Sequence, residues 1–238
     1  MRPAWLGLCG LRLKIALLIL FTSGLVFGLS LTAVSQGYAS WDAQSVKLDN
    51  GLISRQVVVR NDSIMTQELH LTNEVSNFIA AEKTTQSLEF SLFANGKSLD
   101  GGSGWKLLSV KPATDGEGGT GAVMDILGIK AAAGLELKVS YYLFPKLPVI
   151  RKEIEVLNVS RSELRLEALL SEKLVLDLNF VESACFTNYG RQKHLGNCVG
   201  NWDDPLLAIH NYHYSRGLLV GNEAPGVLKH VDYNVKIK

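Results

Sequence analysis

Hydrophobic and polar residues alternate along two neighbouring segments near the middle of the chain. Residues 135–143 carry an apolar or aromatic side chain at every second position, and residues 150–158 largely repeat the pattern. Alternation with a period of two predicts half-buried β-strands. Pro145 and Pro148 lie between the two segments and interrupt any hydrogen-bonded ladder. We therefore expect two consecutive strands joined by a proline-bounded corner.

Short alternating segments recur from residue 40 onward, separated by glycine, asparagine and aspartate. Residues 49–51 read Asp-Asn-Gly between two such segments, which is a strong hairpin signal. Residues 74–87 are the best helical candidate and are short. The glycine-rich stretches 100–104 and 115–121 are expected to be turns, because neither has a phosphate-binding spacing followed by a helix. The pattern predicts an all-β fold with two antiparallel sheets packed as a sandwich.

The N-terminal segment has the pattern of a targeting signal. Residues 15–34 contain no charged residue, three cations precede them, and small-residue cleavage sites follow. A run of about 20 uncharged residues is also long enough to cross a bilayer as a helix. We expect residues 1–39 to be a signal peptide or a membrane anchor with a hydrophobic leader helix. Residues 40–238 would then be an exported β-sandwich domain, periplasmic or extracellular, touching the membrane only through an uncleaved leader.

Composition narrows the class of partner. Charged residues make up 20% of the 238-residue chain and hydrophobic residues 47%, which is typical of a globular protein. Without the three cations of residues 1–39, 21 basic and 23 acidic residues remain, a net charge of −2. A chain that is close to neutral and has no basic run lacks the electrostatic pattern of nucleic-acid binding. We expect no nucleic-acid partner.

Two cysteines remain once the leader is set aside. Cys185 and Cys198 are predicted to form a disulfide, because an exported protein folds in an oxidising compartment. The alternative is a metal site that includes His194, which lies between them. Two sulfurs and one imidazole at this spacing match no zinc pattern, so we expect no metal and no cofactor.

Polar and aromatic residues concentrate between residues 188 and 226, and residues 188–204 are expected to form a loop. The candidate substrate-binding residues are His194, Trp202, Asp203, Asp204, Asn222 and Glu223. Trp202 is either a core residue or a platform on which a sugar ring stacks. Asp203 and Asp204 are adjacent, so in extended chain they point to opposite faces, and Asp-Asp-Pro is also typical of a turn. Asn222 and Glu223 either face a ligand or cap a turn.

No complete catalytic site is visible. The chain lacks a Ser-His-Asp order, an H-E-x-x-H motif and a G-x-S-x-G motif. A pair of carboxylates suited to glycoside hydrolysis also does not stand out. We therefore nominate no catalytic residue.

Three stretches together resemble a known family. Residues 141–158, "YYLFPKLPVIRKEIEVLN", are similar to a strand pair in the N-terminal domain of glycoside hydrolase family 36, the α-galactosidase-like enzymes. Residues 48–59, "LDNGLISRQVVV", and 216–230, "RGLLVGNEAPGVLKH", resemble that domain's opening hairpin and closing strands. The resemblance covers about residues 42–238 and implies a β-supersandwich with a galactose-mutarotase-like fold.

The resemblance also implies a function. In this family the sandwich precedes a (β/α)8 barrel that carries both catalytic aspartates, and that barrel would begin after Lys238. The chain is then the non-catalytic N-terminal part of an exported enzyme acting on α-galactosides, with loops that help to wall the sugar pocket. Two alternatives stay open: a stand-alone carbohydrate-binding or cell-surface interaction module, and a sugar epimerase of the mutarotase type.

Overall fold

A computed structural model describes the fold of this chain from Val34 onward. The described residues are 34–74, 76–81, 86–176, 182–187, 190–195, 198–202, 206–211, 216–221, 223 and 229–233. Side chains are described from Gly37 to Leu176 within these ranges, and beyond Leu176 for Ile209, residues 217–221 and Glu223. The predicted leader helix lies outside the described residues. Among the residues that are described, no helix is long and apolar enough to cross a membrane.

The first sheet is antiparallel and follows chain order. Its strands are β1 (Val34–Gln36), β2 (Ala39–Trp41), β3 (Ser45–Asp49), β4 (Ile53–Arg60) and β5 (Ser63–Leu71). The predicted hairpin at residues 49–51 joins β3 to β4, and Gly51 there has a φ of +81°. β1 and the first residue of β2 fall within the segment assigned to the leader, and Ala39 is buried in the core.

The second sheet contains the two strands that the alternating pattern predicts. Its strands are β8 (Trp105–Thr114), β9 (Thr120–Gly128), β10 (Leu135–Leu143) and β11 (Ile150–Asn158), in the order β11-β10-β9-β8. β10 and β11 pair without interruption from Leu135 opposite Asn158 to Leu143 opposite Ile150. The apolar positions of β10 are buried and the polar positions between them are half-buried. The proline-bounded corner is confirmed.

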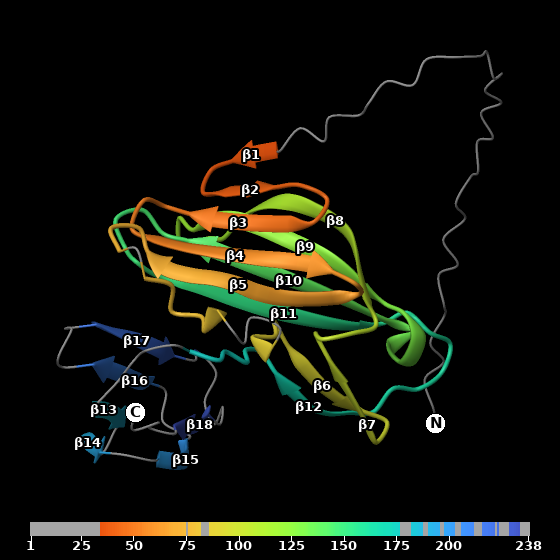
Figure 1. The fold of residues 1–238 in the computed structure, drawn as a ribbon. Coiled ribbons are helices and arrows are strands. Elements are labelled where there is room, and N and C mark those ends of the chain that lie inside the picture. Colours follow the sequence, from red (N-terminus) through yellow and green to blue (C-terminus); the bar gives the residue numbers. More distant parts are fainter. Residues whose placement is uncertain are drawn as a thin grey trace, which may run out of the picture. The chain divides into compact units, whose positions relative to one another are not determined.

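The two large sheets pack face to face (Figure 1). Val46 and Val57 of the first sheet and Leu137 and Val139 of the second belong to one buried hydrophobic cluster. Trp105 is fully buried there and meets Phe90 edge-to-face, with ring centroids 4.8 Å apart. An antiparallel β-sandwich is therefore the architecture of this part of the chain, as the sequence predicts.

A smaller sheet adjoins the sandwich. It consists of β6 (Ser91–Ala94), β7 (Lys97–Asp100) and β12 (Leu166–Leu170), in the order β12-β6-β7. The β6–β7 turn is Asn95-Gly96, and both residues have positive φ angles of 50° and 71°. A two-residue hairpin turn requires such angles, and Asn-Gly supplies them at low cost.

Residues 74–87 differ from the helical prediction. None of their described residues is α-helical, and Ile79 instead forms a β-bridge with Leu176. Ala81 and Gln86 are in 3-10 conformation.

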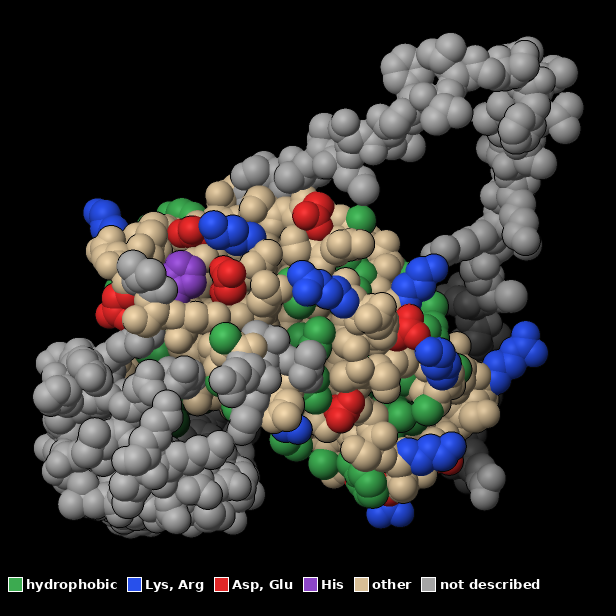
Figure 2. Space-filling model, viewed as in Figure 1, with side chains coloured by type: hydrophobic (Ala, Val, Ile, Leu, Met, Phe, Trp, Pro, Cys, Tyr) green, Lys and Arg blue, Asp and Glu red, His purple; other side chains and the backbone are tan. Residues whose placement is uncertain are grey.

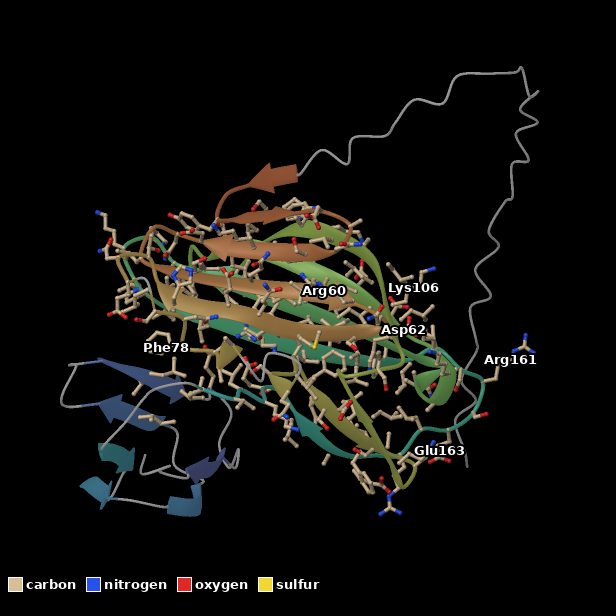
Figure 3. All side chains as sticks on the ribbon, in the orientation of Figure 1. Arg60, Asp62, Phe78, Lys106, Arg161 and Glu163 are labelled. Atoms are coloured by element: carbon tan, nitrogen blue, oxygen red, sulfur yellow. The ribbon has the colours of Figure 1, made fainter. Side chains whose placement is uncertain are left out.

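A short 3-10 turn, η2 (Lys130–Ala132), lies between β9 and β10. Lys130 in this turn pairs with Asp62 at 2.5 Å. Figure 3 places Asp62 at the opposite end of the sandwich from Phe78.

The last part of the chain forms three strand pairs. The strands are β13 (Glu182–Thr187), β14 (Gly190–Leu195), β15 (Cys198–Trp202), β16 (Leu206–Asn211), β17 (Arg216–Gly221) and β18 (Lys229–Tyr233). β13 pairs with β14, β15 with β18, and β16 with β17. The prediction of a loop over residues 188–204 is wrong for 190–195 and 198–202, which are strands. Hydrogen bonding between paired backbones forms a ribbon without requiring the apolar alternation that the prediction sought.

Candidate functional site

One end of the sandwich is held together by the side chain of Asn50. Its Nδ2 donates hydrogen bonds to the carbonyl oxygens of Phe144 and Leu147, both at 2.8 Å. Its Oδ1 accepts from the backbone N–H groups of Leu52 and Ile53, both at 3.0 Å. One asparagine therefore closes the β3–β4 hairpin and fastens it to the proline-bounded corner of the other sheet.

Arg151, the second residue of β11, brings in two further segments. Its Nη1 donates to Asp115 at 3.1 Å and its Nη2 to Glu117 at 2.8 Å, both in the β8–β9 turn. Its Nε donates to Glu223, just after β17, at 2.8 Å. Its guanidinium also lies over the ring of Phe144, 5.3 Å from the centroid. We call Asn50, Asp115, Glu117, Phe144, Leu147, Arg151 and Glu223 the loop-end cluster.

The carboxylates of the loop-end cluster differ in exposure. The side chain of Asp115 is 9% exposed, whereas those of Glu117 and Glu223 are 69% and 76% exposed. The hydrogen bond from Arg151 to Glu117 contributes most to raising the pKa of the guanidinium. Glu117 and Glu223 therefore present their carboxylates to solvent. The cluster is suited to accept hydrogen bonds from ligand hydroxyl groups.

Of the predicted binding residues, the structure describes the contacts of Glu223 alone, which lies in the loop-end cluster. His194 is in β14, and Trp202 is the last residue of β15, opposite Lys229. The side chains of both lie outside the described residues, as do Asp203, Asp204 and Asn222 entirely. The cluster thus joins Glu223 to three segments that sequence reasoning did not connect with it.

The disulfide stays a prediction. Cys185 lies in β13 and Cys198 begins β15, and their side chains are outside the described part of the chain. In the part whose side chains are described, no group of three His, Cys, Asp or Glu residues could hold a metal ion. On the face seen in Figure 2, acidic and basic side chains are interspersed without a broad area of one sign.

Sequence reasoning missed a buried ionic cluster inside the sandwich. Nη2 of Arg55, from β4, lies 2.9 Å from Oε1 of Glu89, and Nη1 lies 2.8 Å from Oε2 of Glu172. Nζ of Lys152, from β11, lies 2.6 Å from Glu89 and 3.5 Å from Glu172. The hydroxyl of Tyr141 donates to Glu89 as well. Two cations and two anions thus neutralise one another between the sheets.

Burial and charge act in opposite directions on these groups. Burial alone would raise the pKa of Glu89, but Arg55 and Lys152 outweigh it and hold that pKa well below its usual range. Burial raises the pKa of Tyr141 far above its ordinary value, and the charge of Glu89 adds to the effect. Glu89 has no exposed side-chain surface, and Arg55 and Lys152 have at most 9%. Arg55, Glu89 and Lys152 are thus held inside the fold, where their mutual neutralisation is structural.

A weak signal of this cluster exists in the sequence. Arg55 occupies the inward phase of β4, between Ile53 and Val57. Lys152 occupies the apolar phase of β11, between Ile150 and Ile154. A charged residue at the core-facing position of a strand requires a buried counter-charge. The pattern could have flagged two cations, but it gives no means of finding Glu89 or Glu172, which lie outside regular strands.

A surface cavity of about 500 Å³ is lined in part by residues of β4 and β5. Arg60, Gln67, Glu68 and Asn77 are among its lining residues. The side chain of Asn77 is already used, because it donates to the carbonyl of Gln67 and accepts from two backbone N–H groups. No predicted binding residue and no aromatic side chain lines this cavity, so it adds little to the candidate site.

Comparisons with known proteins bear on the fold. No protein-family model and no curated protein matches the sequence. A solved structure of a glycoside hydrolase family 36 α-galactosidase, AgaB from Geobacillus stearothermophilus, is similar in fold, with a TM-score of 0.51 and 13% sequence identity. The match covers 76% of this chain and 32% of the α-galactosidase chain. The chain therefore shares its all-β architecture with about a third of that enzyme.

Proposed function

We propose that this chain is the non-catalytic N-terminal portion of an exported α-galactosidase-like glycoside hydrolase. Its loops would help to form the sugar pocket of a following (β/α)8 domain that carries the catalytic aspartates. The observation that carries the proposal is the fold similarity, which relates most of this chain to about a third of an α-galactosidase. The sequence resemblance of the strand pair, the opening hairpin and the closing strands supports the same assignment.

The loop-end cluster is the proposed contribution to the pocket. Glu117 and Glu223 expose carboxylate oxygens while Arg151 fixes their positions. Carboxylates accept hydrogen bonds from sugar hydroxyl groups, and an arginine that orients them lowers the entropy lost on binding. Trp202 and His194 are proposed to complete the sugar contacts, with Trp202 stacking on the apolar face of the ring.

The test is kinetic and uses the enzyme encoded by the complete gene. Glu223→Gln should raise KM for an aryl α-galactoside by about tenfold, the effect of losing one hydrogen bond to a charged group. Trp202→Ala should also raise KM or lower kcat/KM, with the free energy of unfolding nearly unchanged. Glu155→Gln is the matched control, because Glu155 forms a surface pair with Lys138 at 3.4 Å and lies on the same strand as Arg151.

Two results would contradict this assignment. Unchanged kinetics in both Glu223→Gln and Trp202→Ala would remove the loop end and Trp202 from the sugar pocket. A loss of about 3 to 5 kcal/mol of stability in Trp202→Ala would make that residue a core residue, because this is the cost of truncating a buried aromatic side chain.

A further inference from the structure

The segment that follows β12 runs beside residues 79–80 and 87–88. We call residues 171–176 the strap. Lys173 donates its N–H to the carbonyl of Leu88, and Val175 donates its N–H to Oγ of Ser87 at 3.0 Å. The carbonyl of Val175 accepts from Ala80 at 3.0 Å. The strap is thus paired with residues 79–80 and 87–88. The first of these two segments directly follows Phe78, which is labelled in Figure 3.

The strap also contributes a charged side chain to the ionic cluster. Its Glu172 carboxylate forms a two-point contact with Arg55, at 2.8 Å to Nη1 and 2.9 Å to Nη2. This carboxylate is 25% exposed, whereas Arg55, Glu89 and Lys152 are nearly or fully buried. Glu172 is therefore the member of the ionic cluster that can leave the interior without either sheet opening.

Charge balance in the interior depends on the strap. Without Glu172, the cations Arg55 and Lys152 would face Glu89 alone, and one positive charge would be left without a partner. A buried charge that loses its partner is strongly destabilising, because neither water nor an opposite charge replaces the lost contact. The apolar anchors of the strap, Leu174 and Leu176, are only partly buried. Electrostatic neutrality is thus a large part of what holds the strap in place.

We propose that Glu172 is a counter-ion latch, which fastens the strap and makes it open as a local unit. The closed strap neutralises the interior, and it fixes the point from which the chain continues to β13 and the strands beyond it. Releasing the latch exposes Arg55 and Lys152 to water on one side while the two large sheets stay paired. This proposal rests on the ionic cluster and does not depend on the sugar-binding role.

Amide hydrogen exchange of the full chain, measured by mass spectrometry of peptides, tests the latch. Glu172→Gln should speed exchange in peptides covering 171–176 and 77–81 by about tenfold to a hundredfold, because local opening no longer breaks an ion pair. Peptides covering β9 and β10 should exchange as in the wild type. Glu167→Gln is the matched control. Glu167, in β12, pairs with the exposed Arg165 at 3.6 Å and accepts from the Gly96 N–H at 3.0 Å, outside the ionic cluster, so its replacement should leave the strap unchanged.

A second variant separates charge balance from loss of one hydrogen bond. In the double variant Glu172→Gln/Lys152→Met, one cation and one anion are removed together, so the interior is neutral again. Strap protection should return to within about threefold of the wild type if neutrality holds the strap. Wild-type exchange in Glu172→Gln would overturn the proposal. Exchange in the double variant as fast as in Glu172→Gln would also overturn it, and so would equal acceleration across β9 and β10.

Discussion

Glu89 has no exposed side-chain surface, yet its negative charge forms ion pairs with both Arg55 and Lys152. Replacing it with glutamine keeps the shape and removes the charge. Glu89→Gln should therefore lower the free energy of unfolding by about 3 to 5 kcal/mol, the usual cost of breaking a buried ion pair. Glu155→Gln, in an exposed pair, should change it by less than about 0.5 kcal/mol. Denaturant unfolding of both variants measures the difference, and a near-neutral Glu89→Gln would refute the structural role of the cluster.

The same residue predicts a dependence on pH. The cations beside Glu89 lower its pKa in the folded state below its ordinary value of 4.5. A lowered pKa stabilises the fold fully above the ordinary value, and this contribution is lost as the pH falls below it. Stability of the wild type should therefore fall between about pH 6 and about pH 3 by more than that of Glu89→Gln. Parallel curves for the two proteins, measured by denaturant unfolding across this range, would contradict the assignment.

At the scale of residues, the sequence predicts which side chains are buried better than it predicts which side chains contact one another. The alternating pattern of β10 correctly places Leu137, Val139 and Tyr141 in the core. It gives no indication that Tyr141 donates to Glu89, because Glu89 lies outside any regular strand and 52 residues earlier in the chain. Of the loop-end cluster, Glu223 alone is among the six binding residues that the sequence predicts, and its partner Arg151 was treated as part of a strand pattern. Contacts between residues far apart in sequence depend on how the two sheets are stacked, and alternation carries no information on that.

Among the elements, the β3–β4 hairpin and the proline-bounded corner are joined by Asn50. Asn50→Asp keeps the oxygen that accepts from Leu52 and Ile53 but places a second oxygen against the carbonyls of Phe144 and Leu147. The variant should lose about 1 to 3 kcal/mol, because two carbonyls lose their donor. Asn61→Asp, in the exposed β4–β5 turn, is the control and should be nearly neutral. Unfolding free energies that match for the two variants would show that the corner is held by other contacts.

Elements with a buried face were predictable, and elements without one were not. Strands such as β10 and β11 reveal themselves by alternation, and the Asp-Asn-Gly turn reveals the hairpin that precedes them. Residues 190–195 and 198–202 are rich in glycine and polar residues, so they were taken for a loop although they pair as strands. These ribbons form by hydrogen bonding between backbones, and such pairing needs no periodic apolar face that a sequence pattern could detect.

For the molecule as a whole, the architecture could be predicted from the sequence more readily than the chemistry. An antiparallel β-sandwich follows from many short alternating segments with turn residues between them, and the structure confirms it. The proposed function rests on likeness to a larger enzyme, because none of the catalytic motifs sought in the sequence was found. Because one fold hosts many functions, the proposal is tested at individual side chains and not by the fold alone.

One comparison of activity tests the proposed function most directly. Hydrolysis of an aryl α-galactoside should be measured for this 238-residue chain alone and for the protein encoded by the complete gene, both prepared from an exporting host. The account predicts no turnover above background for the chain alone. It predicts turnover for the complete gene product, abolished by replacing the catalytic aspartates of its barrel. Turnover by the chain alone, or a complete gene product that contains no barrel and no α-galactosidase activity, would contradict it.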